Sequence, residues 1–509
     1  MRFHISPKMK YGLSIVFILA AMLIASCGRT EKEVQKEIIL ARIGDVDISL
    51  NEFIRRSEMT IRPPYCKGDN NLHKKIILNS LIAEKMLALE AAENELLTEN
   101  ERFQLYIQGR QEQAMREQLL KEEVYDQVNV DESAIQVEFD LAGRDYTVQY
   151  FSIYDDSLAS VLDRELLNRA GFFEQLHAQL WPEEELAQRQ VSWESQESSQ
   201  IHAALFSQPV SKGAVIGPLR IENGHHILIK VRGWTDELAI SDNEQKQRWE
   251  AVQNRQTMAQ ARRDYTEYIV GVMAGKKLEF NAPVFAQMVR IVKPFYTLSP
   301  EERNELFLKA AFDRNAENPE LQQLAAGITD ILEEPFFSID GKSWTVAEFT
   351  DALQRHPLVF RNQGEDAKNF ARQYRLAVVD MVRDQYLTEE AYKRGLQNHA
   401  AVKRERQIWH DALLAQFEAN RYLQENVPGQ PDSIQTAIML EQYLNPYVDQ
   451  LQARYSDRIE VDVERFNEIR PTRTDLLALR QNVPFSVLVP AFPQVTTDSK
   501  LDYGRRMEK

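Results

Sequence analysis

The sequence has very few cysteines and no dense run of basic residues. Its 509 residues include two cysteines, Cys27 and Cys66, so at most one disulfide can form within the chain. The formal net charge is −16, whereas a nucleic-acid-binding protein would normally carry a basic face. We therefore expect no nucleic-acid partner. Apolar residues make up 43% of the chain, which is typical of a globular protein, and the length suggests about three to four domains.

The N-terminus also lacks an apolar run long enough for a comfortable transmembrane helix. Residues 13–24 are apolar but short, and three basic residues precede them. The run ends in the sequence IASC, which resembles a bacterial lipobox. The resemblance implies that residues 1–26 are a signal peptide and that Cys27 is lipidated. Cys66 would then have no disulfide partner, and the hydrophobic cores alone must hold the exported fold. The alternative is that residues 1–26 stay uncleaved as an N-terminal membrane anchor, which would give the chain nearly the same membrane topology.

This N-terminus predicts a protein of the cell envelope. Gly28, and not an aspartate, follows the cysteine, which is the pattern that directs such lipoproteins to the outer membrane in enteric bacteria. We therefore expect a periplasm-facing lipoprotein of the outer membrane. Residues 27–37 would be its charged tether, and the lipid anchor would provide the contact with the membrane.

Two segments of the remaining chain share one pattern. Each has a short strand, a turn and a helix start with a capping box, at Ser49 in the first segment and at Thr345 in the second. Apolar residues at helical spacing follow in both segments, at a nearly constant offset. Any two amphipathic helices can be aligned, but the shared entry favours an internal duplication. We interpret residues 38–130 and 335–425 as two copies of one helical module.

A helix that runs into a short strand is predicted after each module. These returning segments cover residues 243–285 and 432–466, and we expect each to close the module that precedes it. About 100 residues, 143–236, separate the first module from its returning segment, and the second copy has no such insert. Residues 467–509 contain several prolines and a polar end, which predicts a loosely ordered tail.

The insert begins with the strand sequence RDYTVQYFSI, continues with helical sequence over residues 157–180 and ends in a hairpin. Asn223-Gly224 is typical of a type I′ turn, so the second strand starts near His225. The stretch ALFSQPVSKGAVIGPLRIENGHHILIKVRG resembles parvulin-type (PpiC, rotamase) peptidyl-prolyl cis-trans isomerases. These carry a similar run of an apolar helix, a Lys/Gly turn, a turn glycine, a histidine and a β-branched strand.

The arrangement of the whole chain resembles the SurA- and PrsA-type exported chaperones. In those proteins a helical module precedes the parvulin domain and a C-terminal helix returns to pack on the module. The resemblance implies an α+β fold with two duplicated, mainly helical modules, the first carrying an inserted antiparallel sheet flanked by helices. It also implies a folding assistant for secreted or outer-membrane proteins, whose partners are unfolded or nascent exported polypeptides and which needs no cofactor.

The resemblance places the isomerase site on the first and last strands of the insert. His226 matches a histidine that parvulins carry on the last strand, and Tyr150 or Gln149 takes the place of the histidine on their first strand. Trp193 matches the end of the family's central motif, and Phe206 and Ile201 are candidates for an apolar proline slot. His225 and His226 point to opposite sides of a strand, so we expect no metal site.

Two departures from the parvulin pattern weaken the catalytic interpretation. The first-strand histidine is replaced, and the Gly-Gly-Asp-Leu-Gly motif is absent. Isomerisation needs only an apolar, suitably polarised pocket that lowers a rotation barrier of about 18–20 kcal/mol, so a degenerate site could still act slowly. The alternatives are a non-catalytic holdase of the same ancestry and an assembly lipoprotein docked on a membrane complex.

Overall fold

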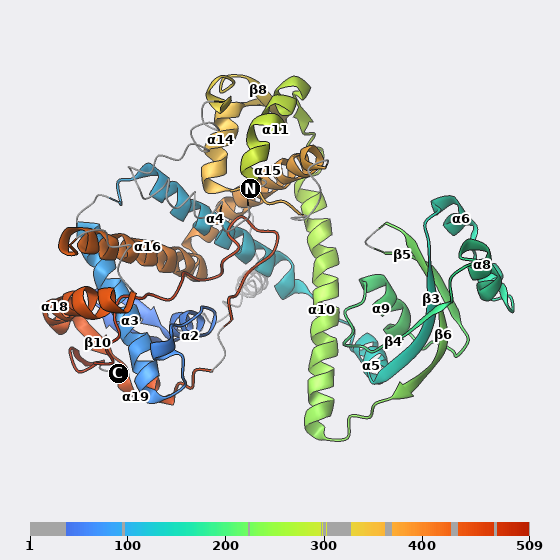
Figure 1. The fold of residues 1–509 in the computed structure, drawn as a ribbon, viewed down its shortest axis with the longest axis horizontal. Coiled ribbons are helices and arrows are strands. Elements are labelled where there is room, and N and C mark those ends of the chain that lie inside the picture. The colour runs from blue at the N-terminus through green and yellow to red at the C-terminus, as the bar shows by residue number, and fades with distance from the viewer. Residues whose placement is uncertain are drawn as a thin grey trace, which may run out of the picture.

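The computed structural model describes residues 37–507 with the exception of 94–96, 222–223, 297, 299–301, 303–326, 362–368, 429–435 and 473–475. These residues form an α+β protein that is mainly helical and contains three small sheets. Figure 1 shows a helical body and a smaller domain, with the long helix α10 (Asp242–Val272) between them. The expected signal peptide, Cys27 and nearly all of the tether lie outside the described residues.

The body begins with a strand hairpin and three helices. They are β1 (Ile39–Ile43), β2 (Val46–Ser49), α2 (Leu50–Glu58), α3 (Asn71–Glu93) and α4 (Glu101–Glu123). Helix α2 begins as predicted, because Glu52 N donates a hydrogen bond to Ser49 Oγ at 3.1 Å. The carboxylate of Glu52, which we predicted to close a capping box, is buried and pairs with Lys85 Nζ at 2.9 Å.

The second segment has the same order of elements. It contains β8 (Pro335–Ile339), β9 (Lys342–Thr345), α14 (Val346–Arg355), α15 (Phe370–Lys393) and α16 (Ala400–Asn426). Its capping box is complete: Glu348 N donates to Thr345 Oγ1 at 3.2 Å, and Thr345 N donates to Glu348 Oε2 at 3.0 Å. The predicted helix start is therefore confirmed here in both hydrogen bonds.

The returning strands are exchanged between the two segments. Strand β7 (Glu279–Phe280) pairs with β8 of the second hairpin, and β10 (Ile459–Val461) pairs with β1 of the first. Our expectation that each returning segment closes the module before it was wrong. The sequence marks a strand by its residue types, but a short strand can pair with any free hairpin edge, and only the packing of the whole chain selects one.

The long helices of the two segments pack across each other. Helix α3 packs along α16, α15 packs on α4, and α4 and α16 are also in contact. The largest core joins residues of α3, α4 and α16 to residues of α18 (Asn445–Tyr455). Figure 1 shows these blue and orange helices side by side. Further α-helices of the body are α11 (Ala282–Tyr296), α17 (Thr436–Met439) and α19 (Val463–Glu468).

The insert forms a separate antiparallel sheet with helices on both faces. Its strands are β3 (Arg144–Ile153), β4 (Ala187–Val191), β5 (Val215–Arg220) and β6 (His226–Asp236), in the spatial order β4-β3-β6-β5. One face carries α6 (Asp156–Val161), α7 (Arg164–Leu167) and α8 (Phe172–Leu180), and the other carries α5 (Glu132–Leu141) and α9 (Ser199–Phe206).

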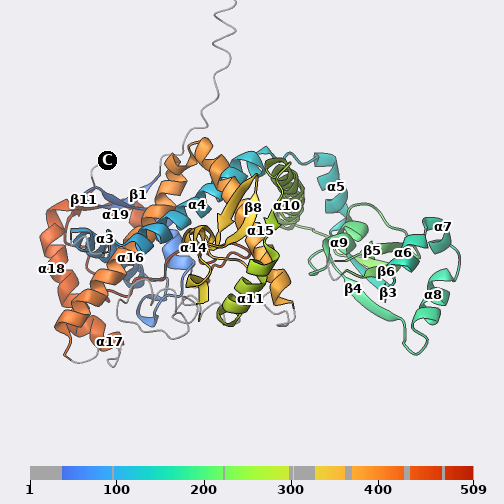
Figure 2. The same ribbon diagram turned by 90° about the horizontal axis from the view of Figure 1, so that it is seen from above.

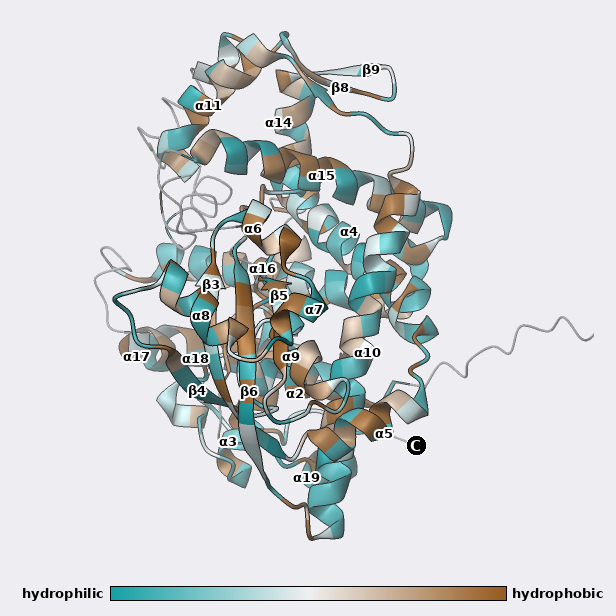
Figure 3. Cartoon of the chain, turned by 90° about the vertical axis from the view of Figure 1, so that its right-hand side faces the viewer, coloured by the Kyte–Doolittle hydropathy of each residue, from teal (hydrophilic) through white to brown (hydrophobic). Residues whose placement is uncertain are grey.

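The predicted hairpin in the insert is confirmed by the antiparallel pairing of β5 with β6. Asn223, in its turn, lies outside the described residues. We did not predict β4 as a separate strand. Figure 2 shows this domain projecting from the body near α5 and α10, and Figure 3 looks onto the face that carries α6, α7 and α8.

The C-terminal tail is not loosely ordered over its described residues. Phe485, Val489, Phe492 and Val495 are buried against the body, and β11 (Arg505–Arg506) adds to the first sheet in parallel with β10. The expectation failed because these apolar residues alternate with prolines and show no helical or strand periodicity. The surface that receives them is formed by helices more than 350 residues away in the sequence.

Candidate functional site

His226 lies at the start of the last strand, as predicted, but its surroundings differ from an active site. It pairs across the sheet with Ile153 and shares a face with Leu228, beneath α6 and α8. Its Nδ1 is buried and lies 3.5 Å from Asp156 Oδ1, longer than a usual hydrogen bond of about 2.7–3.2 Å. The imidazole is therefore only weakly oriented.

Tyr150 lies on the opposite face of the sheet from His226. It pairs with Ile229, packs with the cluster beneath α9, and has the Arg189 guanidinium 4.7 Å from its ring centre. Gln149 shares the face of His226 but pairs with Lys230, four residues along β6, which corresponds to about 13 Å. The structure thus brings neither candidate next to His226.

The two residues proposed for a proline slot belong to the hydrophobic core. Phe206 is fully buried, with its ring centre 5.3 Å from that of Tyr146, and Ile201 is buried beside it. A bound peptide could reach Phe206 only if the domain opened. The aromatic side chain at this helix position therefore fills the space between α9 and the sheet.

Trp193 contacts the two helices, α5 and α10, that connect the inserted domain to the body. Its Nε1 donates to Glu138 Oε1 of α5 at 2.8 Å, and the guanidinium of Arg255, from α10, lies over its ring at 5.4 Å. The neighbouring His202 is buried, and burial together with the charge of Arg255 lowers its pKa to about 4. His202 is thus neutral near pH 7, and Trp193 links the inserted domain to α5 and α10 through Glu138 and Arg255.

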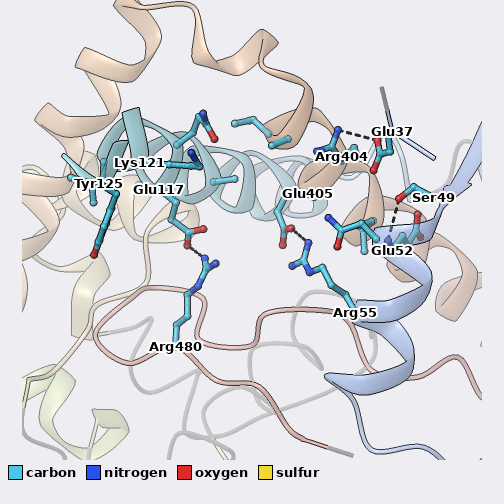
Figure 4. Close-up of a pocket in the computed structure, with 17 residues that line it drawn as sticks. Glu37, Ser49, Glu52, Arg55, Glu117, Lys121, Tyr125, Arg404, Glu405 and Arg480 are labelled. Atoms are coloured by element: carbon cyan, nitrogen blue, oxygen red, sulfur yellow. Dashed lines mark hydrogen bonds and ion pairs between the residues drawn. The ribbon is translucent and has the colours of Figure 1, made fainter. Parts of the chain in front are cut away.

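The body contains a charged cavity of about 500 Å³ that sequence reasoning missed. Helices α2, α4 and α16 line it together with Arg480 of the tail. Figure 4 shows Arg55 reaching Glu405 and Arg480 reaching Glu117 across this space, and the first of these pairs measures 2.9 Å. Each charge in these pairs comes from a different element, so the sequence carried no local signal for them.

A buried ionic cluster lies behind this cavity. Lys85 Nζ is 2.9 Å from both Glu52 Oε1 and Asp411 Oδ2, and Arg56 binds Glu84 through two hydrogen bonds of 2.8 and 2.7 Å. All five side chains are at most 6% exposed. These residues join α2, α3 and α16, so they hold the two segments in register.

The pKa values of this cluster follow from burial and from its two cations. Burial raises the pKa of Glu52 above its ordinary value, despite the charge of Lys85. Burial would also raise the pKa of Asp411, but Lys85 and His410 outweigh it and hold that pKa below its usual range. Burial disfavours the Lys85 ammonium, yet Asp411 and Glu52 outweigh this effect and raise its pKa. The cluster therefore contains a lysine cation held by at least one carboxylate.

The part of the chain that the structure describes contains neither a candidate metal site nor a helix suited to span a membrane. These residues contain no group of three or more His, Cys, Asp or Glu side chains placed to hold a metal ion. No helix among them is long and apolar enough to cross a bilayer. Comparisons with protein-family models, with curated proteins and with solved structures found no match to this chain.

Proposed function

We propose that this chain is an exported, lipid-anchored chaperone of the SurA/PrsA kind that holds unfolded polypeptides and whose parvulin-like domain is not an efficient isomerase. The observation that carries this proposal is the sheet of the inserted domain. Its first and last strands are central neighbours, as the resemblance implies, whereas His226 and Tyr150 lie on opposite faces. The domain thus has an antiparallel sheet flanked by helices, as the proposal requires, but His226 and Tyr150 are not placed to act together.

The proposal includes an internal duplication, which is supported by corresponding contacts in the two segments. The hairpins pair with their exchanged strands in corresponding registers, Arg42 with Glu460 and Ser338 with Glu279. Corresponding hydrogen bonds close both helix starts, from Leu50 N to Ile38 O at 2.8 Å and from Val346 N to Glu334 O at 3.0 Å. Two copies of one helical module would give a broad, symmetric cradle for extended chains. A slow isomerase is the second candidate, favoured by the acidic Asp156 near the half-buried His226.

Removing the inserted domain should leave the holding activity in place. Gly143 and Glu237 are already adjacent, since Glu237 N donates to Gly143 O at 2.6 Å, so deletion of residues 144–236 can be closed without moving α5 or α10. We expect this variant of the mature chain, prepared without its lipid, to suppress aggregation of a denatured client to within about twofold of the intact chain. Light scattering measures this, and a prolyl-peptide isomerisation assay runs on the same samples.

The control is His226→Ala in the intact chain, which should change neither readout. Isomerisation by the intact chain at the rate of an efficient isomerase, lost in His226→Ala, would contradict the non-catalytic interpretation. Loss of all holding activity on deletion, in a variant that remains folded by circular dichroism, would place client binding in the inserted domain instead of the body.

The lipid anchor is tested by Cys27→Ser. Because the cysteine thiol carries the lipid in such signals, the variant should accumulate as an unprocessed precursor or leave the membrane fraction. Fractionation and gel mobility measure this, with Cys66→Ser as the matched cysteine control. A Cys27→Ser variant that fractionates and migrates like the unchanged protein would contradict the lipobox interpretation.

A further inference from the structure

The C-terminal tail crosses the body as an extended segment. We call residues 485–498 the strap. It belongs to no helix and no strand of a sheet; its one backbone bridge joins Val487 to Leu479 of the preceding tail. Pro490 and Pro493 lie within it, and proline cannot donate to a strand ladder. The strap must therefore be held by something other than regular secondary structure.

Side chains of the body hold the strap by its main chain. The donors come from α2, α3 and α4, and each reaches a backbone carbonyl: Gln113 to Phe485 (3.0 Å), Arg110 to Val487 (2.9 Å), Arg56 to Ala491 (2.9 Å) and Asn79 to Asp498 (2.7 Å). Gln113 Oε1 also accepts from Phe485 N at 2.9 Å. These bonds recognise an extended backbone and not particular side chains.

Apolar side chains of the strap fill the surface between these polar contacts. Phe485 packs edge-on against Tyr106, with ring centres 5.2 Å apart, and Phe492 and Val495 belong to the largest core. The polar groups that line this surface are themselves at most 8% exposed: Arg56, Asn79, Arg110 and Gln113. Without a chain across them, each of these side chains would lose a hydrogen-bond acceptor on the strap.

We infer that this surface is a peptide-binding groove and that the strap is a built-in competitor for it. The occupant that displaces the strap is an extended, unfolded segment whose aromatic or aliphatic side chains are spaced like Phe485, Val489 and Phe492. The groove continues into the charged cavity, because Arg55 both lines the cavity and donates to Leu488 O at 3.2 Å. This inference rests on the proposed holding function and names its site and its regulation.

Hydrogen exchange on the intact mature chain tests the displacement. The client is reduced and carboxymethylated lactalbumin, which stays unfolded. When it saturates the protein, amides of residues 485–498 should exchange at least about tenfold faster, because the strap leaves the groove, while amides of α3 stay protected. Binding of the client with unchanged exchange in the strap overturns this inference and leaves the holding function intact. Failure of the client to bind overturns the holding function itself.

A second measurement uses a strap that is weakened in place. The double variant Phe485→Ala/Phe492→Ala keeps the length of the tail but weakens the strap. A fluorescent peptide of residues 483–498 should bind to this variant at least about tenfold more tightly than to the unchanged chain. In the unchanged chain the tethered strap has a high effective concentration and competes with the peptide. The control Leu477→Ala/Leu479→Ala alters exposed residues of the same tail and should bind the peptide as weakly as the unchanged chain.

A third substitution and the folding of the double variant complete this test of the groove. Adding Gln113→Ala to the weakened strap should reduce peptide binding, because it removes both hydrogen bonds to residue 485 of the peptide. A folded double variant that does not bind the peptide overturns the inference. If the double variant does not fold, the exchange measurement on the unchanged chain alone decides it.

Discussion

Replacing Lys85 with alanine should lower the free energy of unfolding of the body by about 3–5 kcal/mol. The Lys85 ammonium is 1% exposed and lies 2.9 Å from both Glu52 and Asp411. Its removal leaves two buried carboxylates without the ammonium that they share, and this costs far more than the loss of an exposed ion pair. Denaturant unfolding followed by circular dichroism measures the change.

The matched control is Lys246→Ala, which removes a lysine from an exposed pair with Glu250 and should leave the unfolding free energy almost unchanged. A triple variant separates charge from packing. Adding Glu52→Gln and Asp411→Asn to Lys85→Ala should recover part of the lost stability, because neutral amides are cheaper to bury than unpaired carboxylates. No recovery would show that the loss is due to the cavity and not to the charges.

The pH dependence of the Lys85→Ala variant has a definite sign. In the unchanged protein the pKa of Asp411 is held low, so its contribution to stability is present above the unfolded pKa of about 4 and is lost as the pH falls. In the variant the same carboxylate lacks its cation, and burial should raise its folded pKa, which reverses that dependence. The stability difference between the two proteins should therefore shrink between about pH 7 and pH 4.

Cysteine pairs placed across the exchanged strands should cross-link almost completely, and a mismatched pair should not cross-link. Arg42→Cys with Glu460→Cys, and Glu279→Cys with Ser338→Cys, place thiols on directly paired residues, whose Cα atoms are about 4.5–5.5 Å apart in an antiparallel pair. Mild oxidation of the soluble mature chain should cross-link each pair nearly completely. Peptide mapping under non-reducing conditions measures the yield.

The informative control pairs the cysteine of the first hairpin with the cysteine of β7. Arg42→Cys with Glu279→Cys joins the first hairpin to the returning strand that follows its own module, and this pair should not cross-link. Formation of the 42–279 bridge in place of the other two would show that each module closes on itself. Cys66 is buried and should remain reduced in all three variants.

The sequence alone determined the features that depend on neighbouring residues. The helix starts at Ser49 and Thr345 were predictable, because a cap hydrogen bond spans three residues. The hairpin that ends in β6 was predictable from alternation and a turn glycine, and so was the α+β class. Strand alternation also placed His226 with Leu228 and away from Ile227 and Ile229.

Only the tertiary structure decided which distant residues meet. Composition and spacing cannot assign β7 to β8 instead of β1, because each hairpin offers a suitable free edge. Glu52 has a local capping pattern, yet its carboxylate lies in the core, where it pairs with Lys85 on α3. The strap has no periodicity of its own, and its order comes from donors on helices that it meets only in the folded chain. Which distant strands and side chains pair with one another depends on the whole fold. It is therefore fixed by packing and by the cost of leaving buried polar groups without hydrogen bonds.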